Sequence, residues 1–275
     1  MTVSLGVILF KVTFYIYLLA TVCYVWNLVR AKGAIGKVAT GLLAAGWVLH
    51  TATLVVRTVA AGRPPFLNLY EYVLSLTWGF VLVYLAVEFT TKNRQLGSFA
   101  MPLVTLFAYM ATRLPSEVNP TMPALRSVWR VPHIATAILA YAAFALAFGL
   151  AFMYLIGERA EGNKKSFWAS RLPSTKVLDE LIYRTLAFGF MMQTALVITG
   201  AVWAQFAWGR YWSWDPKETW SLITWLIYAT FLHMRLTRGW RGKKTALMCI
   251  IGFVATMFTL FGVSYLLPGL HSYAS

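Results

Sequence analysis

Residues 208–220, with the sequence WGRYWSWDPKETW, combine flat aromatic rings with charged groups. The stretch holds four Trp, one Tyr, two basic and two acidic residues in thirteen positions. Trp and Tyr are enriched at both interfaces of membrane proteins, where an aromatic belt usually places only a few rings at each helix end. A binding surface for an apolar, partly planar ligand accounts for a denser cluster. Four rings lie within seven residues here: Trp208, Tyr211, Trp212 and Trp214.

The second half of this stretch predicts the start of a helix. Asp215 suits the N-cap position, Pro216 suits N1 because it has no N–H, and Glu218 suits N3 of a capping box. The first half could form a further helix lying on the membrane. In that case the i, i+4, i+7 spacing places Trp208, Trp212 and Asp215 on one face.

The composition indicates a membrane protein built from helices. The chain has 275 residues, of which 59% are hydrophobic and 12% charged, and its mean hydropathy is +0.65. Long apolar runs recur along its whole length, which predicts an all-α, polytopic integral membrane protein. We expect about eight spans, each near the ~20 residues that cross a bilayer. They cover residues 5–29, 38–60, 69–89, 96–112, 132–157, 181–204, 217–236 and 245–267.

The positions of the basic residues predict the orientation in the membrane. The formal net charge is +15, but the charges lie in short loops between apolar runs, which argues against nucleic-acid binding. The loops after the first, third, fifth and seventh spans hold 16 of the 24 Lys and Arg residues. The positive-inside rule makes these loops cytoplasmic or stromal. Both termini and the tryptophan-rich segment between spans 6 and 7 are then extracytoplasmic.

Two of the four histidines fall at the membrane level of the tryptophan-rich segment. His133 lies at the outer start of span 5, and His271 lies just beyond the outer end of span 8. Two neutral imidazoles can ligate a haem iron axially, while aromatic rings pack against the porphyrin. The alternative interpretation is that each is a solvated residue at a helix end.

The other two histidines lie inside predicted spans. His233 lies in span 7, roughly 20 Å deeper than the start of that helix, and an ionisable side chain at such a depth suggests a functional site. His50 lies near the middle of span 2. Their depths do not match well, so the sequence does not pair them. Either could instead be a hydrogen-bonded packing residue.

At these residues the chain resembles a known family. The stretch WGRYWSWDPKETWSLITWLIYATFLHMR, 208–235, is similar to the WWD signature of haem-handling proteins in cytochrome c biogenesis. In particular it resembles the CcsA (ResC-type) subunits of the System II cytochrome c synthase. Further similarity lies in VPHIATAILAYAAFAL at 131–146, GLHSYAS at the end and RPPFLNLYEYVLSLTWG at 63–79. We therefore expect an N-terminal helix pair, 1–60, followed by a WWD haem-handling membrane domain, 61–275.

The resemblance implies that the protein moves haem b to the outer side of the membrane and presents it there. His133 and His271 would ligate the iron of the outer haem, and His233 would ligate a haem within the bilayer. The membrane would be the bacterial cytoplasmic membrane or the thylakoid membrane. The residues expected to bind haem are His133, His271, His233, Trp208, Trp212, Trp214, Asp215, Tyr211, Trp220, Arg126, Arg130 and Arg210.

The reaction that the resemblance implies is thioether formation. Two Cys thiols of an apocytochrome c CxxCH motif add to the haem vinyl groups, so the chain needs no catalytic nucleophile of its own. Neutral imidazole supports ferrous haem and can be displaced by the incoming His. The implied partners are a CcsB/ResB/Ccs1-type membrane subunit, apocytochrome c and a thioredoxin-like thiol reductant. With them the protein would form a holocytochrome c synthase.

The haem propionates need cationic partners. Arg side chains suit bidentate contacts with carboxylates, and Arg126, Arg130 and Arg210 are the best candidates among the basic residues expected near the outer face. Glu71 is an acidic residue at membrane depth, for which we expect a structural bond to a neighbouring helix.

Three other functions compete with this interpretation. A CcmC-like protein would load haem onto a chaperone without ligating it to a cytochrome. A b-type electron-transfer subunit would hold haems between His pairs at matched depth, which the two His at span ends disfavour. A small-molecule permease with an aromatic site gives no reason for the positions of the His residues.

Overall fold

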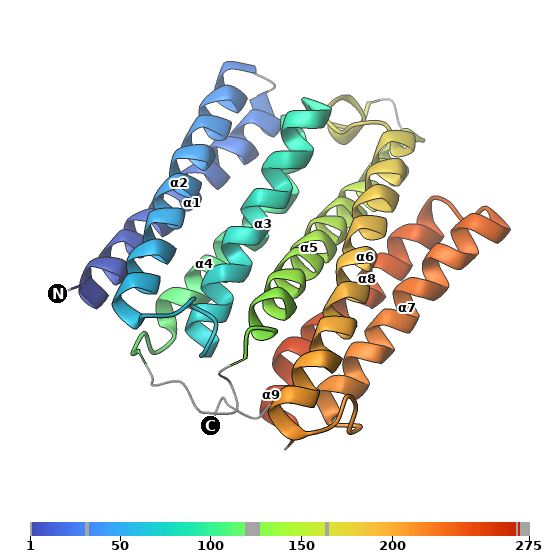
Figure 1. The fold of residues 1–275 in the computed structure, drawn as a ribbon. Coiled ribbons are helices and arrows are strands. Elements are labelled where there is room, and N and C mark those ends of the chain that lie inside the picture. The colour runs from blue at the N-terminus through green and yellow to red at the C-terminus, as the bar shows by residue number, and fades with distance from the viewer. Residues whose placement is uncertain (1, 31–32, 119–126, 163–164, 268, 270–275) are drawn as a thin grey trace. The chain divides into compact units, whose positions relative to one another are not determined.

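A computed structural model of the chain describes residues 2–30, 33–118, 127–162, 165–267 and 269. Within these residues all regular structure is helical, as the composition predicts (Figure 1). The elements are α1 (Thr2–Arg30), α2 (Gly33–Ala61), α3 (Leu69–Thr91), η1 (Arg94–Leu96), α4 (Gly97–Arg113), α5 (Arg130–Glu161), η3 (Trp168–Ser170), α6 (Thr175–Trp208), α7 (Pro216–Arg238), α8 (Lys243–Met257), η4 (Phe258–Gly262) and α9 (Val263–Leu266).

A helical segment occupies each of the eight predicted spans, but only six segments within the described residues are long and apolar enough to cross a membrane. These six are α1, α2, α3, α5, α6 and the continuous run Lys243–Leu266. The helices in the other two predicted spans, α4 and α7, are not long or apolar enough, each for a different reason. Helix α4 has only 17 residues and contains Pro102. Helix α7 has 23 residues, but polar groups and Trp lower its hydropathy.

The chain divides into two compact units. Unit 1 comprises Met1–Asn119 and Phe152–Leu178, and unit 2 comprises Pro120–Ala151 and Asp179–Ser275. Helices α5 and α6 therefore each contribute residues to both units. These units are defined by contacts alone, so the functional division at residue 60 stays a prediction.

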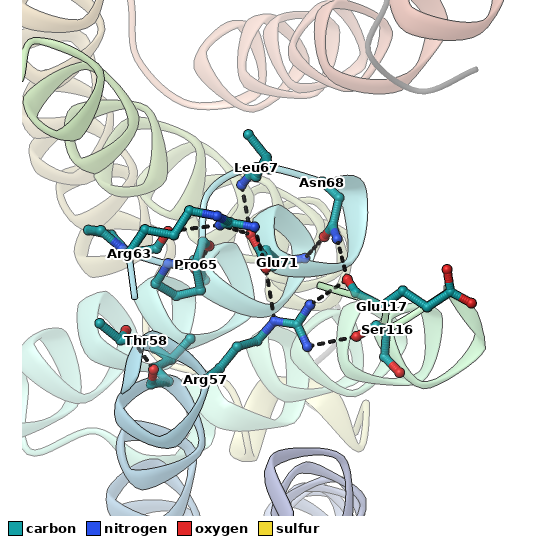
Figure 2. Close-up of polar contacts among 12 residues, drawn as sticks. Arg57, Thr58, Arg63, Pro65, Leu67, Asn68, Glu71, Ser116 and Glu117 are labelled. Carbon is teal, nitrogen blue, oxygen red and sulfur yellow. Dashed lines mark hydrogen bonds and ion pairs between the residues drawn. The ribbon is translucent and has the colours of Figure 1, made fainter. Parts of the chain in front are cut away.

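One end of unit 1 is organised around a buried carboxylate, Glu71, at the start of α3 (Figure 2). Arg57 of α2 donates through Nε to Glu71 Oε1 at 3.0 Å, and Arg63 donates to Glu71 Oε2 at 2.8 Å. Arg57 also donates to the backbone carbonyls of Ser116 (2.8 Å) and Glu117 (3.0 Å). Glu71 therefore makes the bond to a neighbouring helix that the sequence predicts, and Arg57 extends it to the segment after α4.

A second buried carboxylate, Glu88, lies near the other end of α3 and joins three helices of unit 1. Its oxygens accept hydrogen bonds from Tyr24 of α1 (2.6 Å), Thr40 of α2 and Tyr84 of α3. Arg94 contributes an ion pair at 3.7 Å. Because a buried polar group is costly unless it is hydrogen-bonded, these contacts specify how α1, α2 and α3 pack.

Part of the core of unit 2 is formed by aromatic rings packed against glycines. Phe144 of α5 stacks on Tyr228 of α7 with ring centroids 3.8 Å apart. Gly189 of α6 and Gly252 of α8 leave room for these rings, because a Cβ on either glycine would come within 2.5 Å of a ring atom. The close approach of helix backbones through small residues is typical of membrane bundles.

Helix α8 passes into a π-helical turn, η4, and ends in α9. Thr259 of η4 donates to the backbone carbonyl of Trp220 at 3.3 Å, and its hydroxyl lies 3.0 Å from that of Thr224 on α7. Single π-helical turns inside α-helices are frequent near functional sites. This one lies against the first turns of α7, which follow the tryptophan-rich segment.

Candidate functional site

The candidate site is at one end of unit 2, where α5 begins, α6 ends and α7 begins. His133 lies in the first turn of α5, and its Nδ1 lies 3.0 Å from the carbonyl oxygen of Leu196 on α6. A carbonyl can only accept a hydrogen bond, so Nδ1 carries the proton. In the neutral ring Nε2 then keeps its lone pair, which is the arrangement that metal-ligating histidines use. The role of His133 as a haem ligand stays a prediction.

Two tryptophans continue from this histidine toward the tryptophan-rich segment. The His133 ring lies 5.4 Å from that of Trp203, and Trp203 lies 5.4 Å from Trp208 at the end of α6. Gly200 permits the arrangement, because a Cβ there would come within 2.8 Å of His133 Cε1 and Nδ1. Trp203 is not among the residues predicted to bind haem. Trp203 lies before the WWD-like stretch 208–235, so the resemblance did not point to it as a haem-binding residue.

The prediction of a further helix before Asp215 is wrong for the described structure. Helix α6 ends at Trp208, and residues 209–215 form no helix. Gly209 has φ +75°, a left-handed conformation that glycine adopts readily at the end of a helix. At the other end, Pro216 disfavours a helical conformation for Asp215, whose φ and ψ are −54° and 146°. Trp208, Trp212 and Asp215 therefore do not share one helix face.

The predicted capping box at the start of α7 is confirmed. Asp215 accepts a hydrogen bond from the Lys217 N–H at 3.0 Å, and Glu218 Oε2 accepts one from the Asp215 N–H at 3.2 Å. Asp215 is only 6% exposed. Gly269 packs directly against it, because a Cβ on Gly269 would collide with Asp215 Oδ2. Gly269 thus lies at the start of α7.

Several rings of the tryptophan-rich segment lie on the surface. Tyr211 is 61% exposed and Trp214 is 68% exposed, whereas Trp212 is half-buried. The rings of Trp212 and Trp214 meet edge to face, with centroids 5.8 Å apart. Trp220 differs from these, because it packs against Phe258 of η4 at 4.3 Å. The exposed rings could contact a flat ligand without rearrangement of the core.

The remaining predicted residues are dispersed. Arg130 begins α5 and is 6% exposed, and Arg210 is exposed. His233 is exposed on α7, on an outward stripe that also carries Leu226 and Thr230. His271 and Arg126 lie outside the described residues. Among the described residues no group of three or more His, Cys, Asp or Glu side chains is arranged to hold a metal ion.

His50 is a buried packing residue of unit 1. It is fully buried, and its Nδ1 lies 3.1 Å from the hydroxyl of Tyr17. Phe10 packs against the ring at 5.1 Å. The interpretation of His50 as a hydrogen-bonded packing histidine, one of the two left open by the sequence, matches this environment.

These features define a helical membrane protein with a histidine and an aromatic surface at one end of unit 2. The chain belongs to the cytochrome C assembly protein family, whose model matches residues 66–271. Within that family it is similar to proteins named cytochrome c biogenesis protein CcsA. The one from Pyropia yezoensis is 37% identical over 281 residues, which cover 88% of each chain. The one from Guillardia theta is 35% identical and covers 96% of this chain and 94% of its own.

A cyanobacterial relative supports the same assignment. Cytochrome c biogenesis protein CcsA from Parasynechococcus marenigrum is 38% identical over 258 residues, covering 84% of this chain and 85% of its own. Among solved structures, cytochrome c heme lyase CcmF matches with a TM-score of 0.69 and 16% identity. The match covers 95% of this chain and 47% of CcmF, and at this identity it establishes the fold alone.

Proposed function

We propose that the protein handles haem in cytochrome c biogenesis by holding it at the candidate site of unit 2 and presenting it for covalent attachment. The observation that carries this proposal is the hydrogen bond between His133 Nδ1 and the Leu196 carbonyl. It fixes the ring orientation and places the proton on Nδ1, which is the tautomer in which Nε2 can ligate iron. The adjoining Trp203 and Trp208 rings add an apolar wall.

His271 is the second proposed axial ligand of this haem. Gly269, two residues earlier in the sequence, packs against Asp215 at the start of α7. This contact supports a role for the C-terminal segment at the same end of unit 2 as His133. Arg130, buried one turn before His133, and the exposed Arg210 are proposed to pair with the propionates, together with Arg126.

The proposal includes eight membrane spans, with α4 and α7 among them. Both termini and the tryptophan-rich segment then lie outside the cytoplasm or stroma, because the loops richest in Lys and Arg lie inside. This orientation makes the candidate site an outer site, where the apocytochrome would arrive.

A second haem site within the bilayer is proposed at His233. Its side chain is exposed on α7, so it can contact groups that unit 2 does not supply. An ionisable side chain on an outward face at membrane depth suits a site completed by another membrane protein. The proposed protein is a CcsB/ResB-type subunit.

The proposed reaction is the addition of two thiols to two vinyl groups. At each vinyl group the sulfur bonds to one carbon while the thiol proton ends on the other, so no net oxidation or reduction occurs. The nucleophiles come from the CxxCH motif of the apocytochrome, whose thiols a thioredoxin-like partner keeps reduced. The chain itself would contribute orientation and ligation, and proximity is a large part of such catalysis.

Co-expression tests the proposed function. The full chain is produced with a CcsB-type partner and a reporter apocytochrome that carries CxxCH, and covalent haem is detected on denaturing gels. We expect a haem-stained reporter only when both membrane proteins are present. Failure of attachment with both present contradicts the synthase role. Haem transferred instead to a separate carrier protein would favour CcmC-like delivery.

A substitution beside the ligand tests the role assigned to His133 without removing the imidazole. In Gly200→Ala the new Cβ would lie 2.8 Å from His133 Cε1, so the ring must leave its position beside Leu196. We expect the Kd for haem to rise about tenfold, which corresponds to about 1.4 kcal/mol. The control is Gly41→Ala on α2, where a Cβ meets nothing within 4 Å. Equal Kd values for haem in the two variants would contradict the role assigned to His133.

A further inference from the structure

Trp214 has a backbone conformation that bulky residues rarely adopt. Its φ is +60°, in the left-handed region, and the only other described non-glycine residue with positive φ is Lys92 at the end of α3. Such a conformation is energetically unfavourable for a bulky residue and persists only where the surroundings enforce it. Trp214 is 68% exposed, so burial of its ring in the core does not enforce it.

One carboxylate oxygen of Glu218 accepts hydrogen bonds from the backbone on both sides of Trp214. Glu218 Oε2 accepts hydrogen bonds from the Ser213 N–H at 2.7 Å and from the Asp215 N–H at 3.2 Å. The Ser213 hydroxyl donates to the same oxygen at 3.1 Å. Backbone N–H groups of neighbouring residues that converge on one anion form a nest, and a pair of right-handed and left-handed residues is one conformation that builds it. The Thr219 hydroxyl adds a bond to the Trp214 carbonyl at 3.3 Å.

A helix cap alone does not need all of these contacts. A capping box requires the N3 carboxylate to accept only from the N-cap N–H, here that of Asp215. The two hydrogen bonds from Ser213 are additional. They hold the residue before Trp214 in place and do not cap α7. The carboxylate therefore does more than begin a helix.

We infer that Glu218 is a positioning residue that holds Trp214 in its left-handed conformation and so sets the edge-to-face pair of Trp214 with Trp212. Without the anion, the two N–H groups lose their shared acceptor, and Trp214 returns to negative φ with its ring pointing elsewhere. The inference deepens the proposed function, on which it rests for the ligand: the positioned rings are a face for the porphyrin plane.

The first test does not involve haem. The full chain is labelled with 5-fluorotryptophan in nanodiscs, and the Trp214 resonance is assigned from Trp214→Phe. We expect Glu218→Ala to shift the ¹⁹F resonances of Trp214 and Trp212 and to leave those of Trp47 and Trp78 in unit 1 unchanged. Glu218→Gln, which keeps an acceptor oxygen but loses the charge, should shift the same two resonances by less. An unchanged Trp214 resonance in Glu218→Ala overturns the inference.

The control removes a side-chain helix cap elsewhere in the chain. Asn68 caps α3 by accepting from the Glu71 N–H at 2.9 Å, and Asn68→Ala abolishes that cap in unit 1. We expect both alanine variants to lower the thermal midpoint, but only Glu218→Ala to move the Trp214 resonance. If Asn68→Ala moves it equally, Glu218 acts through general stability and the inference is wrong.

A haem titration then links the position of Trp214 to binding. We expect Glu218→Ala and Trp214→Ala each to raise the Kd for haem about tenfold and the double variant to add little more, because coupled residues are not additive. Independent, additive losses would overturn the positioning role even if the resonance shifts. If the wild-type chain binds no haem, the proposed function fails, while the fluorine result still decides the inference about Glu218.

Discussion

His133→Ala is expected to lower the haem that copurifies with the full chain and its CcsB-type partner by more than about tenfold. The substitution removes the imidazole whose Nδ1 faces the Leu196 carbonyl at 3.0 Å, and with it the Nε2 proposed to bind iron. The space left beside Gly200 admits a free imidazole, so added imidazole should restore much of the haem. The measurement is the reduced absorption spectrum of the purified complex with and without imidazole.

The matched control for this experiment is His50→Phe. His50 is also an imidazole in a predicted span, but it is fully buried in unit 1 and bonded to Tyr17. We expect this variant to keep its haem and to show no response to imidazole. The ligand assignment fails if His133→Ala retains wild-type haem, or if imidazole raises the haem content of both variants alike.

Glu71→Ala is expected to cause a large loss of stability in unit 1. The carboxylate is fully buried, and it is the acid paired with both Arg57 and Arg63, which are 4% and 10% exposed. Removing one partner from a buried ion pair leaves uncompensated charge and typically costs about 3–5 kcal/mol. The measurement is the free energy of unfolding from denaturant titration in a mild detergent.

The control for this prediction is a glutamate in an exposed ion pair. Glu180 bonds to Arg184 at 2.7 Å, with side chains 46% and 74% exposed, and its other oxygen lies 3.7 Å from the buried Arg235, with which Asp179 also pairs at 2.8 Å. Pairs of this kind between residues i and i+4 contribute about 0.3–0.5 kcal/mol, so Glu180→Ala should change the free energy of unfolding little. Losses of similar size in both variants would show that burial of the Glu71 cluster does not matter.

The helices could be predicted from the sequence because their signals are local. Apolar runs near the thickness of a bilayer gave all eight segments, and α7 begins at Pro216, one residue before the predicted start at 217. The capping box was predictable for the same reason, since Asp215, Pro216 and Glu218 lie within four positions. The number of membrane spans is harder to predict from the sequence, because α7 contains Trp and polar residues where the other spans have aliphatic ones.

The arrangement of the site depends on contacts that leave no local pattern. The partner of His133 is a backbone carbonyl, and any residue in place of Leu196 would supply one. The left-handed conformation of Trp214 follows from hydrogen bonds to Glu218, whereas tryptophan itself disfavours it. The acceptor role of Glu88 likewise depends on Tyr24 and Thr40, which lie on other helices. Sequence spacing identified residues of interest, but tertiary packing determines how they are oriented.

The ion pair between Arg57 and Glu71 has a consequence for how the chain enters its membrane. A charged side chain at the centre of a helix costs about 2.5–3.5 kcal/mol when that helix is inserted alone by the translocon, and a charge near a helix end costs less. The two charges face each other across a connection of only seven residues, 62–68, between α2 and α3. Each helix can neutralise the charge of the other only if both leave the translocon together. We therefore expect the pair to favour insertion of α2 and α3 as a single helical hairpin.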